Sequence, residues 1–142
     1  MAETKALLFD DGLVTYDLNG AAQVKFNPTD SSFVERLFLT FDALDKKQEA
    51  YKAEVEKAAG SREIFDIARK RDAEMRTMID DALGQPVCCA LFGEMNVYAM
   101  ADGLPVWCNL LLAVMDEVDT SFARERKAAD PRIKKYTAKY RK

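Results

Sequence analysis

The chain has 142 residues, of which 49% are apolar and 32% are charged. This length predicts one domain that buries about two thirds of its unfolded surface and needs no disulfide or metal to stay folded. The 21 basic and 24 acidic residues give a formal net charge of −3, which excludes a general electrostatic attraction to nucleic acids or anionic membranes. Histidine is absent, so the sequence excludes histidine-based triads, histidine metal ligands and a histidine proton shuttle.

Three cysteines, two of them adjacent, do not form the spaced, even set that is typical of a small secreted domain. The apolar run at residues 6–9 is too short for the core of a signal peptide. The most apolar stretch, residues 104–115, falls short of the ~20 residues that cross a bilayer. We therefore expect a soluble protein of the cytoplasm with no membrane association.

Apolar residues alternate with polar ones on both sides of Asn19-Gly20, which predicts a β-hairpin over about residues 7–26. A two-residue turn would place the two apolar sets on opposite faces of the hairpin. A three-residue loop at 19–21 instead pairs Leu18 with Ala22 and Tyr16 with Val24, and all the apolar side chains then share one face. We expect this register, and we expect the hairpin to pack on the rest of the chain, because an isolated hairpin is only marginally stable.

Two long amphipathic helices follow the hairpin. The first is predicted over 31–59, with Thr29, Asp30 or Ser32 as its N-cap, and the second over 61–83, with Ser61 as a possible cap. Gly84-Gln85-Pro86 ends the second helix. The expected buried residues are Phe33, Leu37, Phe41, Leu44, Tyr51, Val55 and Ala58 in the first helix and Ile64, Ala68, Met75, Ile79 and Ala82 in the second.

The last third of the chain predicts a short helix at 86–92, a connection between Gly93 and Gly103, and a long helix over 103–129. Apolar residues cover nearly every face of residues 104–118, which indicates a central, buried helix. Residues 132–142 are expected to form a basic polar tail. The predicted fold class is thus α+β and predominantly α-helical: a single compact domain over 1–131 with its N-terminal hairpin packed on about four helices.

The segment Ala6–Gly12 (ALLFDDG) resembles the opening strand of haloacid-dehalogenase-like phosphatases. That chemistry needs a second aspartate two positions after the nucleophile, but Gly12 occupies the position two after Asp10. The chain then enters a hairpin, whereas the phosphatase fold needs a crossover helix. A small hydrolase that uses Asp10 is kept only as an alternative, and an acidic turn is the simpler interpretation.

The other reactive side chains predict no catalytic or metal site and no cofactor. Cys88 and Cys89 make a poor chelate without a CxxC spacing or a histidine, so we expect both, like Cys108, to be buried and apolar. Adjacent carboxylates on a helix point about 100° apart and so do not converge on one substrate. We expect the grouped carboxylates of the helices to lie on solvated faces: Asp80, Asp81, Asp116, Glu117 and Asp119.

The basic tail interleaves cations with aromatic residues, as in Lys134-Lys135-Tyr136 and Lys139-Tyr140-Arg141. Such a segment could stack on single-stranded bases, but a solubilising, fraying end is the simpler interpretation. We expect weak, non-specific nucleic-acid binding at most. A regulator that binds nucleic acid through residues 132–142 is an alternative that truncation of the tail would test.

Residues 24–38 (VKFNPTDSSFVERLF), continuing through residues 41–46, resemble small proteins that are encoded by tailed phages and prophages of Gram-positive bacteria. In those proteins a short hairpin leads through an Asn-Pro-Thr-Asp-like turn into a long helix. Residues 92–107 (FGEMNVYAMADGLPVW) continue the likeness. The chain is similar to the tail assembly chaperone class, over most of its length but only loosely, and the matching residues include no catalytic signature.

This resemblance implies a protein without enzymatic activity that binds the tape measure protein and tail tube subunits while the tail assembles. A homo-oligomer is a further expectation. Such chaperones shield the apolar stripes of a long helical client, which would otherwise aggregate. A structural connector or completion protein of the same particle is the alternative. As the contact surface we predict large apolar side chains within the glycine-flanked connection and just after it: Phe92, Met95, Tyr98, Met100 and Trp107. Burial of all five in the core is the competing interpretation.

Overall fold

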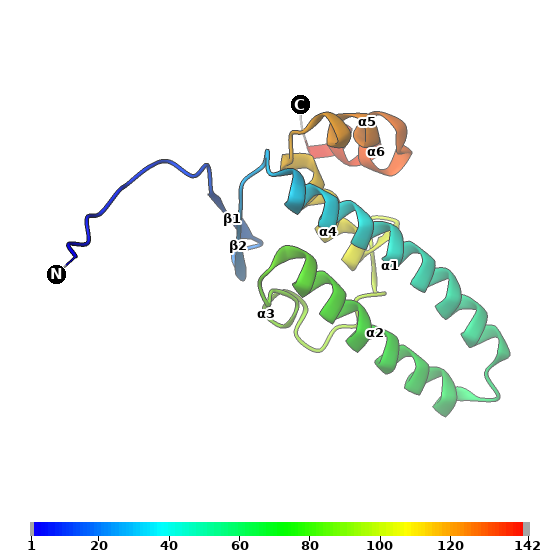
Figure 1. Cartoon of the computed structure of the whole chain (residues 1–142). Helices are drawn as coiled ribbons and strands as arrows, with labels where there is room; N and C mark the ends of the chain where they lie inside the picture. The colour runs from blue at the N-terminus through cyan, green and yellow to red at the C-terminus, as the bar shows by residue number, and fades with distance from the viewer. Residues whose placement is uncertain (1, 141–142) are drawn as a thin grey trace.

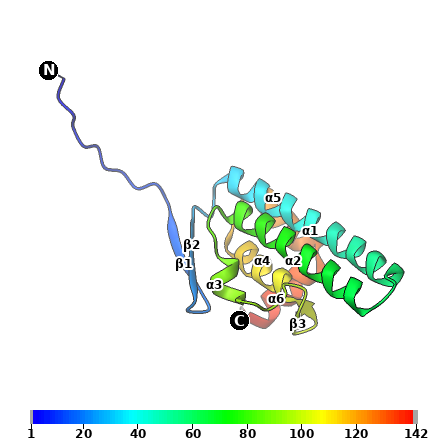
Figure 2. The same cartoon turned by 90° about the horizontal axis from the view of Figure 1, so that it is seen from below.

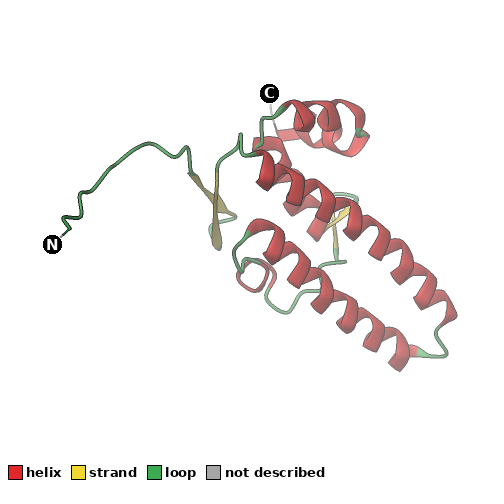
Figure 3. Ribbon diagram, in the orientation of Figure 1, coloured by secondary structure: helices red, strands yellow, loops and turns green. Residues whose placement is uncertain are grey.

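The computed structural model describes residues 2–140, apart from the side chains of residues 136–140. In this part of the chain, six helices are accompanied by two antiparallel pairs of short strands (Figure 3). The predicted α+β class, dominated by helices and with a hairpin at its N-terminal end, is confirmed. No helix of the described residues combines the length and the apolarity that a membrane crossing requires.

Strands β1 (Val14–Leu18) and β2 (Ala22–Phe26) form the predicted hairpin in the predicted register, with Leu18 opposite Ala22 and Tyr16 opposite Val24. Asn19 and Gly20 both have positive φ angles, and Ala21 N donates to Leu18 O to close the loop. The strand begins at Val14, so the predicted start of the hairpin near residue 7 is wrong. Residues 2–13, called here the N-terminal arm, belong to no helix or strand and lead away from the body of the molecule (Figures 1 and 2).

Helices α1 (Ser31–Lys57) and α2 (Ser61–Leu83) run antiparallel, and the bounds of α2 are those predicted. Asp30 is the N-cap of α1, because its Oδ1 accepts a hydrogen bond from Ser32 N at 2.9 Å. The residues that were predicted to be buried in these two helices are buried where the helices meet the rest of the fold, and only partly buried toward the α1–α2 loop. The buried members are Phe33, Leu37, Phe41, Leu44, Met75, Ile79 and Ala82.

The short helix α3 (Cys88–Phe92) leads to a second strand pair, β3 (Met100–Ala101) and β4 (Leu104–Pro105). Asp102 and Gly103 have φ angles of 57° and 80°, which is the two-residue turn that suits a hairpin. The prediction that residues 103–105 open a helix is therefore wrong. Helix α4 (Val106–Glu117) begins directly afterwards and is central and largely buried, as predicted.

The prediction of a single helix over 103–129 is also wrong. The chain is extended at Val118, and a separate helix, α5 (Ser121–Ala129), begins after Thr120. Thr120 Oγ1 caps α5 by accepting from Ala123 N at 3.1 Å. Asp119 N donates to Pro28 O at 2.8 Å, so the break is tied to the turn that precedes α1.

The expected polar tail instead contains helix α6 (Pro131–Tyr140). Proline is favoured at the first position of a helix, because its missing N–H would have no partner there. Ile133 is 1% exposed in the core, and Arg132 pairs with Asp45 of α1. The prediction of a fraying end is therefore wrong for the start of this segment, whereas the aromatic and basic side chains at 136–142 lie outside the described residues.

Candidate partner-binding site

A cleft of about 520 Å³ lies between the tip of the β1–β2 hairpin, the chain around α3, and α4. Asp17, Leu18 and Asn19 line it from the hairpin, while Asn109, Leu110 and Ala113 line it from α4. The remaining lining residues, which run from the end of α3 to the first residue of α4, are Leu91, Phe92, Met95, Ala101, Asp102 and Val106. We call this space the hairpin cleft; its walls are mainly apolar, with two carboxylates and two amides among them.

The chain that carries Met95 is held in place by a clamp from α2. The guanidinium of Arg76 donates from Nη2 to Gly93 O at 2.8 Å and to Met95 O at 2.7 Å, and from Nε to Asp72 Oδ2 at 3.0 Å. Asp72 Oδ1 accepts from the backbone N of the fully buried Val97 at 2.8 Å. These bonds to the guanidinium and carboxylate are charge-assisted, and they fix one wall of the hairpin cleft.

Two further polar side chains fix the neighbouring elements. Asp80 Oδ1 accepts from Val87 N at 3.0 Å and from Cys88 N at 3.1 Å, which secures the start of α3. Asn109 Nδ2 donates to Ala101 O at 2.8 Å and holds β3 against α4. The expectation that Asp80 belongs to a solvated face is wrong, because its carboxylate is part-buried and positions this backbone.

The five predicted contact residues do not form one surface. Phe92 and Met95 line the hairpin cleft, where Phe92 is part-buried and Met95 is 45% exposed. Met100 is 64% exposed on β3 but is not among the lining residues. Trp107 is 1% exposed, contacts Phe41 edge-on and donates from Nε1 to Gln48 Oε1 at 2.7 Å. The prediction of Trp107 as a surface contact is therefore wrong, and it belongs to the core.

Tyr98 faces the helical pair and is therefore part of the packing. Its ring stacks on Tyr51 with a centroid distance of 4.2 Å, and its buried Oη has no hydrogen-bond partner among the described residues. Burial, followed by the neighbouring Tyr51, raises the pKa of the Tyr98 hydroxyl above its ordinary value. The phenol is thus held neutral, as packing against Tyr51 requires.

The cysteines divide between core and surface. Cys88 and Cys108 are buried as predicted, whereas Cys89 is exposed, so the prediction of its burial is wrong. Burial, followed by the charge of Asp80, raises the pKa of the Cys88 thiol, and burial raises that of Cys108 to about 11. Because the thiolate is the nucleophile and the metal ligand, both buried thiols are unreactive near neutral pH. Within residues 2–135, no group of histidine, cysteine and carboxylate side chains has the geometry of a metal site.

Asp10 lies in the exposed N-terminal arm and does not line the hairpin cleft. Its Oδ1 accepts from Gly12 N at 2.9 Å, which is the hydrogen bond of a local turn. The structure therefore places this carboxylate in a turn, and it brings none of the other singled-out carboxylates into hydrogen-bonding contact with it.

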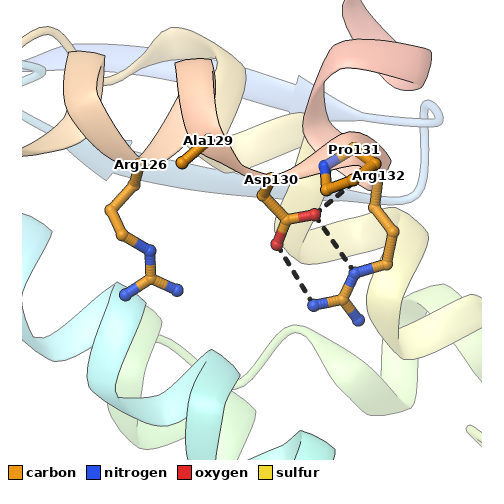
Figure 4. A pocket seen from close by; sticks show the side chains of 5 residues that line it. All are labelled: Arg126, Ala129, Asp130, Pro131 and Arg132. Carbon is orange, nitrogen blue, oxygen red and sulfur yellow. Dashed lines mark hydrogen bonds and ion pairs between the residues drawn. The ribbon is translucent and has the colours of Figure 1, made fainter.

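A second hollow, of about 570 Å³, lies at the α5–α6 junction and is lined by Arg126, Ala129, Asp130, Pro131 and Arg132 (Figure 4). We call it the arginine hollow. Arg126 donates to both oxygens of Asp42, at 2.8 and 3.2 Å, and Arg132 donates to both oxygens of Asp45, at 2.8 and 2.9 Å. These guanidiniums therefore join α5 and α6 to α1, and we assign the hollow a structural role.

Arg132 and Asp130 also pair with each other, at 3.2 Å. The hydrogen bonds that Arg132 donates to Asp45 are the largest of the effects that raise the pKa of Arg132, and together these effects outweigh the lowering by burial. Burial alone would raise the pKa of Asp130, but the hydrogen bonds and charge of Arg132 outweigh it and lower that pKa. Both groups are thus held in their charged forms at the junction.

Sequence reasoning missed the residues that shape the hairpin cleft, above all Asp72 and Arg76. The i, i+4 spacing of Asp72 and Arg76 on α2 can be read from the sequence. The carbonyls to which Arg76 donates belong to Gly93 and Met95, which follow Arg76 by 17 and 19 residues, and no local pattern indicates them. It also missed the three adjacent apolar side chains of the N-terminal arm, Leu7, Leu8 and Phe9, which are 85%, 95% and 84% exposed. Residues 6–9 were considered only as a segment too short for a signal peptide and as part of the phosphatase-like segment at residues 6–12.

Comparison with protein-family models, with curated proteins and with solved structures found no match for this chain.

Proposed function

We propose that the protein is a non-enzymatic component of phage or prophage tail morphogenesis, of the tail assembly chaperone type, which acts in the host bacterial cytoplasm. Its clients are the tape measure protein and tail tube subunits. The resemblance of residues 24–46 and 92–107 supplies the setting of this proposal. The observation that carries it is the hairpin cleft, whose apolar side chains are accessible from solvent and held on a rigid frame.

The cleft suits an apolar stripe on a helical client. Its volume of about 520 Å³ lies in the range of sites that hold a compact apolar group with a few polar contacts. Helix-in-groove recognition uses a few apolar anchors at helical spacing, and Leu18, Phe92 and Leu110 offer apolar walls to such anchors. Asp17 and Asp102 add carboxylates, so we expect the client helix to carry lysine or arginine beside its apolar stripe.

The test compares two exposed methionines, only one of which lines the cleft. The full chain is co-expressed with the tape measure protein of the same phage or prophage, and the captured amount is measured by co-purification. Met95→Asp should reduce capture more than about tenfold, because it places a charge among apolar walls. Met100→Asp is the matched control and should leave capture near that of the unmodified chain.

Three outcomes would contradict this proposal. Absence of any complex with the unmodified chain would refute the client, and equal losses in the two variants would refute the cleft as the binding site. Retention of the protein in purified virions would identify a structural component, as expected for a connector or completion protein.

A further inference from the structure

The N-terminal arm carries three adjacent large apolar side chains that are almost fully exposed. Leu7, Leu8 and Phe9 are each at least 84% exposed and adjacent in sequence. Single exposed apolar residues are normal on a protein surface, but a contiguous set marks a contact site. The arm runs outward from the hairpin in both views (Figures 1 and 2), so its own molecule leaves these side chains uncovered.

The base of the arm is fixed by hydrogen bonds. Asn27 Nδ2 donates to Asp11 O at 3.0 Å, while Gly12 N and Leu13 N donate to the carboxylates of Asp10 and Asp11. Gly12 has a φ of +72°, and a Cβ atom there would lie 2.5 Å from Asn27 Nδ2. A glycine is therefore needed for this close approach, and the bonds aim the arm away from its own body.

An apolar groove of about 570 Å³ opens beside the base of the arm, between the start of α1 and the start of α5. Its lining comprises Val34, Glu35, Leu39, Thr120, Ser121 and Phe122, together with Ser31. Leu39 and Phe122 are 62% and 47% exposed, and the Phe122 ring is held edge-on against Phe38. We call it the α1–α5 groove.

The arm and the groove lie at the same end of the molecule. Asn27 holds the arm at Asp11, and the adjacent Pro28 accepts from Asp119 N, one residue before the groove-lining Thr120. A chain extends at most about 3.5 Å per residue, so Leu7 reaches about 14 Å from Asp11. Two copies that meet at this end around a two-fold axis can each place an arm in the groove of the other, and symmetry forms the contact twice.

The order of the charged residues favours the arm of a second copy as the occupant of the α1–α5 groove. In the arm, Lys5 precedes Leu7–Phe9 and Asp10 follows them. On α1, Glu35 lines the groove, and Arg36 lines the neighbouring hollow that shares Leu39 with it. Neither Glu35 nor Arg36 has an ion-pair partner within the described residues. A docked arm would therefore bring Lys5 to Glu35 and Asp10 to Arg36 on either side of the apolar contact.

We propose that residues 2–13 of one copy bind the α1–α5 groove of a second copy, with Leu7, Leu8 and Phe9 covering Leu39 and Phe122, and that two copies exchange their arms reciprocally. This inference concerns the protein alone and goes beyond the proposed function, because it requires no tape measure protein and uses a different surface from the hairpin cleft.

The test is the molar mass of the purified full chain in solution, measured by light scattering after size exclusion. The unmodified chain should be a dimer. The arm variant Leu8→Asp/Phe9→Asp and the groove variant Leu39→Asp should each be monomeric, with a dissociation constant raised more than about tenfold. Phe65→Asp is the matched control, since Phe65 is 61% exposed on α2, and it should remain dimeric.

Mixing the arm and groove variants should restore part of the dimer, because one intact arm then meets one intact groove. The helical signal in circular dichroism and the fluorescence of the buried Trp107 report whether each variant is folded. Leu39→Ser replaces Leu39→Asp as the groove variant if the aspartate unfolds the protein. If the unmodified chain is monomeric, the proposal is overturned. This holds also where the arm of a monomer covers the groove of its own molecule. A dimer that survives both variants, or a mixture that remains monomeric, overturns it as well.

Discussion

Asp72 connects α2 to the chain around the hairpin cleft through both carboxylate oxygens, which bind Arg76 Nε and Val97 N. Val97 is fully buried, so its N–H cannot turn to water if the carboxylate is removed. An unsatisfied buried donor costs about 1–3 kcal/mol. We therefore expect Asp72→Ala to lower the free energy of unfolding by about 2 kcal/mol and to loosen the wall that carries Met95.

Urea unfolding followed by the fluorescence of Trp107, the single tryptophan, measures this change. Asp66→Ala is the control on the same helix, because Asp66 pairs with Arg69 where both side chains are well exposed. Exposed pairs contribute little, so the control should change stability by less than about 0.5 kcal/mol. Equal losses in the two variants would show that Asp72 does not act as a clamp.

At the scale of elements, the C-terminal helix α6 is an integral part of the fold. Ile133 is 1% exposed, and Arg132 lies over the Phe41 ring at 4.6 Å while pairing with Asp45. Truncation of a buried isoleucine to alanine removes apolar contacts and leaves a cavity. Ile133→Ala should therefore lower the free energy of unfolding by about 2 kcal/mol, the smaller end of the usual range.

Lys134→Ala is the matched control, since the next residue along α6 is exposed, and it should cost less than about 0.5 kcal/mol. Both variants are compared by chemical denaturation under the same conditions. If Ile133→Ala were as mild as the control, α6 would behave as a fraying end and its packing on α4 and α5 would be refuted.

The elements that the sequence predicted well are those whose signals are local. The parity of Leu18 and Ala22 about the loop determined the hairpin register, and the apolar spacing along α1 and α2 identified their buried faces. The break between α4 and α5 was missed because the apolar run outweighed the capping triplet Asp119-Thr120-Ser121. Asp130-Pro131 was interpreted as a helix end, although it is also the start of α6.

The candidate site was predictable only in part, for a related reason. The glycine-flanked connection directed attention to Phe92 and Met95, both of which line the hairpin cleft. Trp107 and Tyr98 were included because a local pattern does not show which side of a segment faces α1. Their contacts with Gln48 and Tyr51 join positions far apart in the sequence, as do the bonds of Arg76, and only the folded chain brings such pairs together.

For the whole molecule, ion pairs join α1 to its neighbours along its length. Between α1 and α2, Glu74 accepts from Lys47 and Arg71, and Arg71 also pairs with Glu54. Hydrogen bonds from Lys47 and then Arg71 lower the pKa of the Glu74 carboxyl, and the one from Arg124 lowers that of Asp119. Together with Asp130, these carboxylates hold protons less tightly in the folded chain than in the unfolded chain.

This difference in proton affinity between the folded and unfolded chains determines the direction in which the free energy of unfolding changes with pH. A carboxylate with a lowered folded-state pKa stabilises the fold above its unfolded pKa, about 3.9 for Asp and 4.3 for Glu, and that stabilisation is lost as the pH falls through the folded value. The chain has no histidine to titrate near neutrality. The free energy of unfolding should therefore stay nearly constant between about pH 6 and 8 and fall below about pH 4.5.

Urea unfolding across this pH range measures the profile, and Glu74→Gln tests its cause. The amide cannot titrate, so the variant should lose stability at pH 7 and show a shallower decline in acid, whereas Glu56→Gln, at an exposed position of α1, should retain the profile of the unmodified chain. A decline in Glu74→Gln as steep as in the unmodified chain would assign the acid sensitivity to other carboxylates. A marked change between about pH 6 and 8 would contradict the assignment to carboxylates altogether, because their pKa values lie far below that range.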